Sequence, residues 1–256
     1  MVMMKVWKLV GVTSLAAMGA AMPVQADTIF GLYAGAQLWN MDGDGTFGNA
    51  DQSSEGTVDF DSEKQNVFYV AIEHPIPFVP NLKFKRTDLE DQGSGNASFK
   101  FEDFDFSGGF TADVDFSHTD IILYYEILDN VVSLDVGLNV MQMDGHVVVN
   151  GVDALNNPRT ERVDFDGYIP TLYLAAEAAL PLTGLSIGGE ISGLAVGGSS
   201  FYDYQVQIQY NVIDNMAVDV GLQLGYRATG LKLDDVDNLD TDLTFSGPYA
   251  GIQVHF

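Results

Sequence analysis

Apolar and polar side chains alternate along several segments, and this alternation most restricts how the chain can fold. YDYQVQIQYNV (202–212) places tyrosine, valine and isoleucine at one parity and aspartate, glutamine and asparagine at the other. VVSLDVGLNVM (131–141) and MAVDVGLQLGYR (216–227) have the same period. A period of two residues predicts β-strands with one apolar face.

The composition of the two faces separates a membrane barrel from a soluble sandwich. Each apolar face is about five residues long with tyrosine near an end, which suits a tilted strand crossing a bilayer between aromatic interfaces. A β-sandwich shows the same alternation, but its solvent face usually carries more lysine and mixed charge. The sequence therefore predicts an all-β, antiparallel transmembrane β-barrel. We expect lipid contact at Val136, Leu138, Ile208 and Leu222, and inward-facing positions at Gly137, Gln207, Gln209 and Gln223.

Short and long connections alternate along the chain. Tight turns are predicted at 73–81, 127–131, 179–185 and 212–216. Long acidic, glycine-rich or asparagine-rich loops are predicted at about 40–63, 88–113, 144–166 and 231–243, with a shorter one at 193–200. Four turns and five loops give ten strands with both chain ends periplasmic, which is the asymmetry of outer-membrane barrels. Eight strands remain the alternative.

The first 26 residues read as a secretory signal peptide. Lys5 and Lys8 precede an apolar run to about Met22, and Val24-Gln25-Ala26 forms a small-x-small cleavage pattern. We therefore expect the barrel to occupy residues 27–256. The chain has no cysteine, so no disulfide can hold it. Nine basic against thirty-six acidic residues would remain after cleavage, which disfavours nucleic acid as a partner.

The last strand ends on an aromatic ring. Counting back from Phe256 in twos gives Val254, Ile252 and Ala250, whereas the other parity is mostly polar or small. A strand whose apolar face continues to its final residue needs a partner strand, and its apolar face needs a surface against which it is buried. In a barrel the last strand pairs with the first, so no edge remains exposed.

Three stretches resemble a family of uncharacterised proteobacterial outer-membrane β-barrel proteins. They are AIEHPIPFVPNLKFKRT (71–87), SHTDIILYYEILDNVVSLDVGL (117–138) and FDGYIPTLYLAAEAALPL (165–182). The resemblance implies location and fold, and no substrate or mechanism. The terminal strand also resembles the signal that is read by the barrel-assembly machinery, with Ile252, Val254 and Phe256 at the expected alternate places.

A cluster of charged side chains lies on the inward parity. It comprises Glu73, Glu126, Glu177 and Glu190, with Lys83, Lys85 and Arg227 as cations. Carboxylates near one end of a narrow barrel repel one another unless they are paired. A salt-bridged interior that fills the barrel is one interpretation, and a cation-selective constriction or small-ligand site is the other.

Enzyme and metal chemistry have weaker support. His118 and Asp120 form the His–Asp half of an omptin-like protease site, and many carboxylates could supply the other half. Ser117 and His118 are adjacent on a strand, so they point to opposite faces and do not form a lipid hydrolase site. The acidic segments 40–52 and 232–244 lack the spacing of an EF-hand loop, and weak bridging of Ca²⁺ or Mg²⁺ to lipopolysaccharide suits them better.

The sequence thus predicts an integral protein of the Gram-negative outer membrane without cofactor, metal site or evident catalytic chemistry. A structural or interaction role at the cell surface is the first hypothesis. A narrow cation-selective passive channel, or transport of a small ligand, is the second. The expected partners are outer-membrane lipid and lipopolysaccharide, the assembly machinery during biogenesis, and divalent cations at the acidic segments.

Overall fold

The computed structural model describes residues 3–4, 30–51, 54–215, 217–236 and 239–256. The predicted signal peptide lies largely outside these residues. All regular structure among them is β. The strands are β1 (Met3–Met4), β2 (Gly31–Asn49), β3 (Gly56–Phe60), β4 (Glu63–Glu73), β5 (Asn81–Thr87), β6 (Glu90–Phe101), β7 (Phe104–Asp115), β8 (His118–Leu128), β9 (Val132–Val152), β10 (Pro158–Leu180), β11 (Leu185–Val196), β12 (Ser199–Asp214), β13 (Asp219–Val236) and β14 (Leu239–His255). None of the described residues forms a helix that could cross a membrane.

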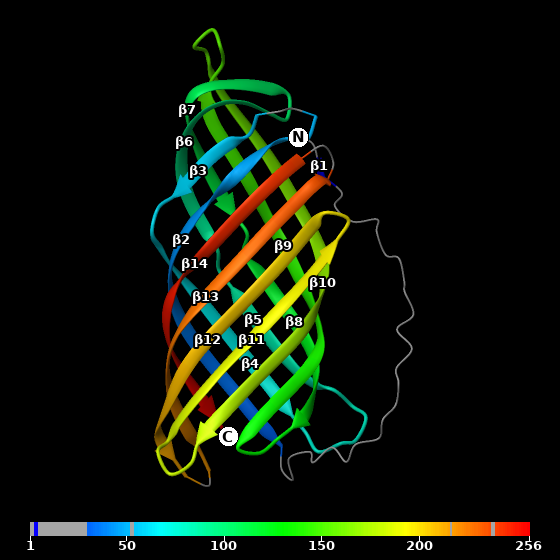
Figure 1. Ribbon diagram of the computed structural model, residues 1–256, viewed down its shortest axis with the longest axis vertical. Coiled ribbons are helices and arrows are strands. Elements are labelled where there is room, and N and C mark those ends of the chain that lie inside the picture. Colours follow the sequence, from blue (N-terminus) through cyan, green and yellow to red (C-terminus); the bar gives the residue numbers. More distant parts are fainter. Residues whose placement is uncertain (1–2, 5–29, 52–53, 216, 237–238) are drawn as a thin grey trace.

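Ten strands close into an antiparallel barrel, which confirms the predicted fold class and strand number (Figure 1). β2 pairs with β4, then β5, β8 and β9 follow, and β10 to β14 complete the ring in sequence order. β14 pairs with β2 from Leu239 to His255, which closes the ring. The four predicted tight turns connect β4 to β5, β8 to β9, β10 to β11 and β12 to β13.

The predicted long loops are wrong, because most of their residues are paired strand. After residue 43 in the sequence, β2 no longer pairs with β4 and pairs with β3 instead. β3 pairs in turn with β6, and β7 pairs with both β6 and β9. The segments 40–63, 88–113, 144–166, 193–200 and 231–243 therefore extend the barrel wall, and the connections between strands there are short. Figure 1 shows this extension as the narrow upper part of the molecule.

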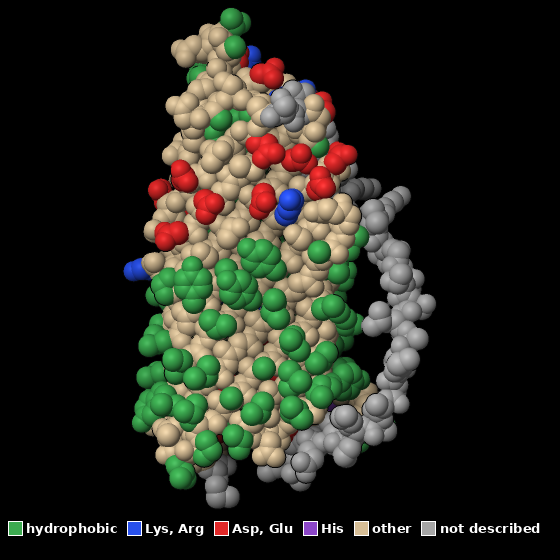
Figure 2. Space-filling model, in the orientation of Figure 1, with side chains coloured by type: hydrophobic (Ala, Val, Ile, Leu, Met, Phe, Trp, Pro, Cys, Tyr) green, Lys and Arg blue, Asp and Glu red, His purple; other side chains and the backbone are tan. Residues whose placement is uncertain are grey.

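The polarity of the two faces reverses along the barrel axis. In the lower part the outward side chains are apolar, as at Leu138 and Leu172, which are both 62% exposed. In the upper part the apolar side chains point inward, as at Phe47 and Phe110, and carboxylates lie outside. Figure 2 shows the apolar band with a belt of acidic residues above it. The loop prediction failed because the inward phenylalanines alternate with Gly, Ser and Asp. The composition of these wall segments therefore resembles that of a loop.

The predicted faces are confirmed in the lower part. Val136, Leu138, Ile208 and Leu222 are exposed on the outside, whereas Gln209 and Gln223 are buried in the interior. The apolar side chains of this part lie outside, and its interior is polar. The candidate site lies in that interior.

Candidate functional site in the barrel interior

A network of buried ion pairs crosses the middle of the barrel. Lys85 on β5 lies with its Nζ 2.8 Å from Asp203 Oδ2 on β12 and 3.2 Å from Glu190 Oε1 on β11. Arg227 on β13 donates from Nε to Asp203 Oδ1 and from Nη2 to Asp203 Oδ2, both at 2.8 Å. Lys83 Nζ lies 2.5 Å from Glu190 Oε2. We call Lys83, Lys85, Asp120, Glu190, Asp203 and Arg227 the central ion-pair network.

The charges in this network balance, with three cations against three carboxylates. The Arg227 side chain is 1% exposed, and those of Lys85 and Asp203 are each 4% exposed. Buried charges of this kind are tolerated only when they are paired and hydrogen-bonded. The fork of Arg227 meets both oxygens of Asp203, which is the strongest geometry for such a pair. The charged side chains of the network are therefore paired with one another and at most 12% exposed.

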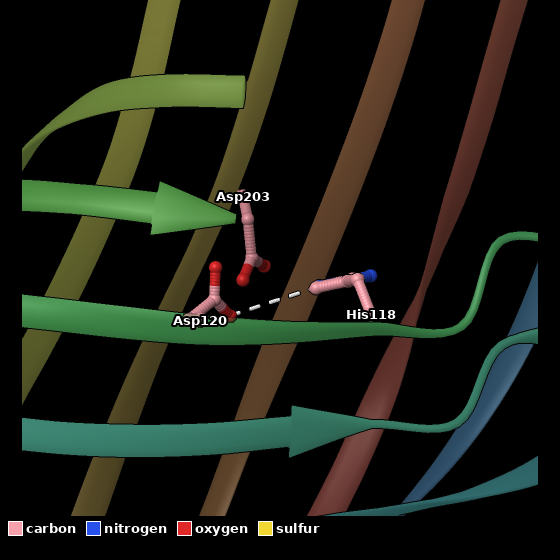
Figure 3. A group of neighbouring side chains, drawn as sticks. All are labelled: His118, Asp120 and Asp203. Atoms are coloured by element: carbon pink, nitrogen blue, oxygen red, sulfur yellow. Dashed lines mark ion pairs between the residues drawn. The ribbon is translucent and has the colours of Figure 1, made fainter. Parts of the chain in front are cut away.

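His118 lies beside this network, on the same strand, β8, as its member Asp120 (Figure 3). His118 Nε2 is 3.7 Å from Asp120 Oδ2, and His118 Nδ1 is 2.9 Å from the carbonyl oxygen of Phe116. Asp120 Oδ1 accepts a hydrogen bond from Asn139 at 2.7 Å. Both His118 and Asp120 are almost completely buried, so a peptide substrate has no access to this pair in this conformation.

His118, Asp120 and Asp203 also bring three possible metal ligands within 4.8 Å of one another. However, both oxygens of Asp203 already accept hydrogen bonds from Arg227, and Lys85 and Thr229 donate to them as well. A divalent cation would have to displace the charges of Lys85 and Arg227. These ligand atoms therefore suit the side-chain cations of Lys85 and Arg227 better than a metal ion.

An apolar layer lies above the network, in the direction of the upper barrel. Its larger buried members include Trp39, Met41, Leu89, Phe101, Met141 and Phe245. The Trp39 indole donates to the Gly247 carbonyl oxygen at 3.2 Å, and the Arg227 guanidinium carbon lies 4.8 Å from the centre of the Trp39 ring. Aromatic rings attract such a cation through their negative faces. The indole therefore joins the ion pairs to the apolar layer.

A polar cavity of about 290 Å³ lies below the network, at the end where the four short turns are. We call it the acidic vestibule. Six carboxylates line it, and Lys83 is the one lysine or arginine among its described lining residues. These carboxylates are Glu73, Glu126, Asp129, Asp135, Glu177 and Glu190. Tyr124 donates to Glu73 at 2.7 Å, Asn81 donates to Glu126 at 3.1 Å, and Tyr173 donates to Glu190 at 3.1 Å.

The structure divides the predicted charged cluster into two groups. Lys83, Lys85, Glu190 and Arg227 belong to the central network, whereas Glu73, Glu126 and Glu177 line the vestibule below it. Asp203, which accepts from Lys85 and Arg227, and Asp120, whose Oδ2 lies 3.8 Å from Lys85 Nζ, were absent from the predicted cluster. The inward parity of Asp203 was visible in the sequence, but its position opposite Arg227 depends on the register between β12 and β13.

The residues of the predicted assembly signal lie at the closing seam. Ile252 and Val254 pair with Ala36 and Ala34 of β2. The Phe256 amide donates to the Leu32 carbonyl oxygen at 3.0 Å, and the Leu32 amide donates to the Phe256 carbonyl oxygen at 3.1 Å. The Phe256 side chain is 56% exposed at the lower rim.

The fold was found among solved structures, with different degrees of similarity. The chain is similar to the outer membrane protease OmpT from Escherichia coli, with a TM-score of 0.51 and 10% identity over 93% of this chain and 99% of that one. Neisserial surface protein A gives a TM-score of 0.28 at 13% identity over 89% and 97% of the two chains. A FadL homologue of Pseudomonas aeruginosa gives 0.39 at 9% identity over 89% and 90%. The sequence matches no protein-family model and no curated protein. The similarity to OmpT shows the fold of an outer-membrane β-barrel.

Proposed function

We propose that this protein is an outer-membrane β-barrel with a closed lumen, which acts as a structural or interaction protein at the cell surface. The observation that carries the proposal is the central ion-pair network, whose three cations balance its three carboxylates and whose Lys85, Asp203 and Arg227 side chains are at most 4% exposed. The apolar layer covers it on one side. Ions would have to cross both layers, and the apolar one offers no ligands to replace their hydration.

The orientation follows from the two ends of the barrel. We infer that the four short turns and Phe256 face the periplasm and that the extended upper wall faces outward, because outer-membrane barrels have short periplasmic turns. The acidic outer surface of the upper wall would then be the part that meets partners. Lipopolysaccharide, bridged through divalent cations, suits this charge, and the seam residues Ile252, Val254 and Phe256 would be read by the assembly machinery.

A narrow cation-selective channel is the second candidate function. The acidic vestibule favours it, because six carboxylates around a cavity of about 290 Å³ attract cations. A small cationic ligand held there would be the related alternative. Conduction requires a path that the central network does not provide, whereas a ligand in the vestibule would need access only from the end with the short turns.

An omptin-like protease is a remote alternative. OmpT shares the fold at 10% identity, which carries no information about activity. His118 is 1% exposed and Asp120 is 2% exposed, beneath the apolar layer. Proteolysis would require both residues to reach a peptide and an attacking water. The buried geometry supports a structural role for this pair instead.

Planar-bilayer recording with refolded protein tests the proposal. We expect no discrete conductance steps in potassium chloride, while heat modifiability on gels verifies that the barrel is folded. Small cation-selective steps that lose selectivity in Glu126→Gln would overturn the closed lumen and favour the channel. Anion-selective steps would contradict both candidates, because the vestibule is acidic.

A further inference from the structure

The barrel wall has a gap on one side of its upper part. β10 pairs with β11 only from Leu172 to Leu180, so residues 158–171 of β10 pair with β9 alone on the other side. The β11–β12 hairpin ends at residues 196–199, and the pairing of β13 with β12 ends at Lys232. Among the described residues, only Met3 and Met4 pair with the free edge of β10, at Asp164 and Phe165. They belong to the predicted signal peptide, whose removal would leave this edge unpaired.

A cavity of about 70 Å³ lies behind this gap, inside the upper barrel. Its lining is almost wholly apolar and includes Phe101, Phe165, Ile169, Leu231, Leu233 and Leu243. A smaller cavity of about 30 Å³ shares Ile169, Leu231 and Leu233 with it and reaches Val196 at the tip of the β11–β12 hairpin. The two cavities therefore continue from the interior toward the gap. We call them together the apolar cavity.

The gap begins at the outer boundary of the apolar band. Leu172 is the uppermost β10 residue that pairs with β11. It points outward and is 62% exposed, and Tyr168 above it is 60% exposed. Tyr202 and Tyr204 on β12 stack at nearly the same level. Tyrosines typically mark the membrane–water interface of such barrels. Acidic residues cover the outside above this level (Figure 2). The opening thus adjoins the outer leaflet.

We propose that the apolar cavity binds the end of a single unbranched hydrocarbon chain, which enters sideways through the gap between β10 and β13. Four observations favour this occupant. The lining offers almost no hydrogen-bonding groups. A volume of about 70 Å³ is smaller than the cavity of about 150 Å³ that accommodates benzene, so a slender chain fits better than a ring. The entrance is continuous with the lipid-facing surface. The polar end of the ligand can remain in water beside Tyr168.

The polar end of the ligand can belong to a free fatty acid or to a membrane phospholipid, because both carry the same hydrocarbon chain. Photolabelling of the refolded chain 27–256 in vesicles distinguishes the two sources. One arm uses dodecanoic acid with a diazirine at its terminal carbon, and the other uses a phosphatidylcholine that bears the same terminal group. Labelled residues are then identified by mass spectrometry.

We expect label on the inward residues Ile169, Leu231 and Leu233, and competition by unlabelled dodecanoic acid in the fatty-acid arm. Leu172 faces outward and should be labelled by any diazirine lipid without saturation. Inward label in either arm supports the proposal, and the arm that gives it identifies the source. Label confined to outward residues such as Leu172 and Leu174 in both arms would overturn it.

Variants that fill the cavity provide the second readout. Ile169→Trp and Leu233→Trp should each abolish the inward label while Leu172 remains labelled, because the new ring occupies the cavity. Tyr168→Trp is the matched control, one residue from Ile169 on the outer face, and should retain the inward label. Heat modifiability verifies that each variant is folded. Undiminished inward label in both filled variants would contradict binding in this cavity.

Discussion

Individual buried charges in this barrel are held by specific partners, and Lys85 shows this most clearly. Its Nζ contacts Asp203 and Glu190, and its side chain is 4% exposed. The adjacent Arg86 points outward with a 49% exposed side chain and pairs with Asp88. Two neighbouring cations on one strand therefore differ in environment, which makes them a matched pair for mutation.

Lys85→Met should lower the free energy of unfolding by about 3–5 kcal/mol, because it leaves buried carboxylates without a counter-charge. Arg86→Met should change it by no more than about 1 kcal/mol, since exposed pairs contribute little. Urea unfolding of the refolded protein in lipid vesicles measures both. Similar losses for the two variants would show that the network does not stabilise the barrel.

Asp91 is a buried carboxylate of the upper wall. It is 4% exposed, and its Oδ2 has no hydrogen-bond partner among the described residues. Burial and the charges of Glu63, Asp61 and Asp42 raise the pKa of Asp91, and the hydrogen bond from the Gln92 amide lowers it, with a net result of about 7. In the unfolded chain the pKa of an aspartate is near 3.9. The folded state thus binds this proton more tightly.

Stability should therefore fall as the pH rises from about 4 to about 7, and the full cost of the Asp91 charge should be present above pH 7. Each pKa unit corresponds to about 1.4 kcal/mol, so the cost is up to about 4 kcal/mol. Asp91→Asn should stabilise the protein at pH 8 and much less at pH 4, as measured by urea unfolding. Glu90→Gln, on the exposed face of the same strand, is the matched control. A pH-independent effect of Asp91→Asn would refute this assignment.

At the scale of the strands, the alternation of side chains predicted the lower barrel well and the upper barrel poorly. The outward residues of β9, β12 and β13 lie where the sequence predicts, because lipid and interior require opposite polarities at successive positions. In β6 and β7 the apolar parity points inward instead, against the opposite wall. A single strand does not reveal which parity is inside, because lipid and a packed core both favour apolar side chains.

The faces can be tested with Ile208 and Gln207 on β12. Ile208 is 54% exposed on the outside, whereas Gln207 lines the acidic vestibule. They serve better than Leu222 and Gln223, because Gln223 is 2% exposed and hydrogen-bonded to Tyr69 and Gln209.

Ile208→Arg should cost about 2–4 kcal/mol, the penalty for arginine at a lipid-facing position near mid-bilayer. Gln207→Arg loses the hydrogen bond from Tyr249, worth about 1 kcal/mol, but places its charge among carboxylates. Urea unfolding in vesicles compares the two. A cysteine at 208 should also be quenched by a lipid-borne nitroxide, and one at 207 should not. Equal quenching at both positions would contradict the assigned faces.

For the whole molecule, the sequence predicted the ten-stranded ring, the four turns and seven of the charged residues of the lumen, without Asp120 and Asp203. It did not predict the partners of those charges, because Lys85, Asp203 and Arg227 come from β5, β12 and β13 and meet only through the closure and register of the barrel. The sequence did not predict the gap beside β10 either, because the gap depends on how far neighbouring hairpins extend along the barrel axis.

The central claim, a lumen closed between the vestibule and the outside, is tested most directly by cysteine accessibility in intact cells. The chain has no cysteine of its own, so single substitutions give an unambiguous signal. Ser133→Cys places a thiol in the acidic vestibule, and Leu155→Cys places one on the connection between β9 and β10, where Leu155 is 84% exposed. A membrane-impermeant maleimide added outside should label Leu155→Cys at once, and Ser133→Cys only after the outer membrane is permeabilised. Labelling of Ser133→Cys in intact cells as fast as Leu155→Cys would show that the lumen is open and contradict the account.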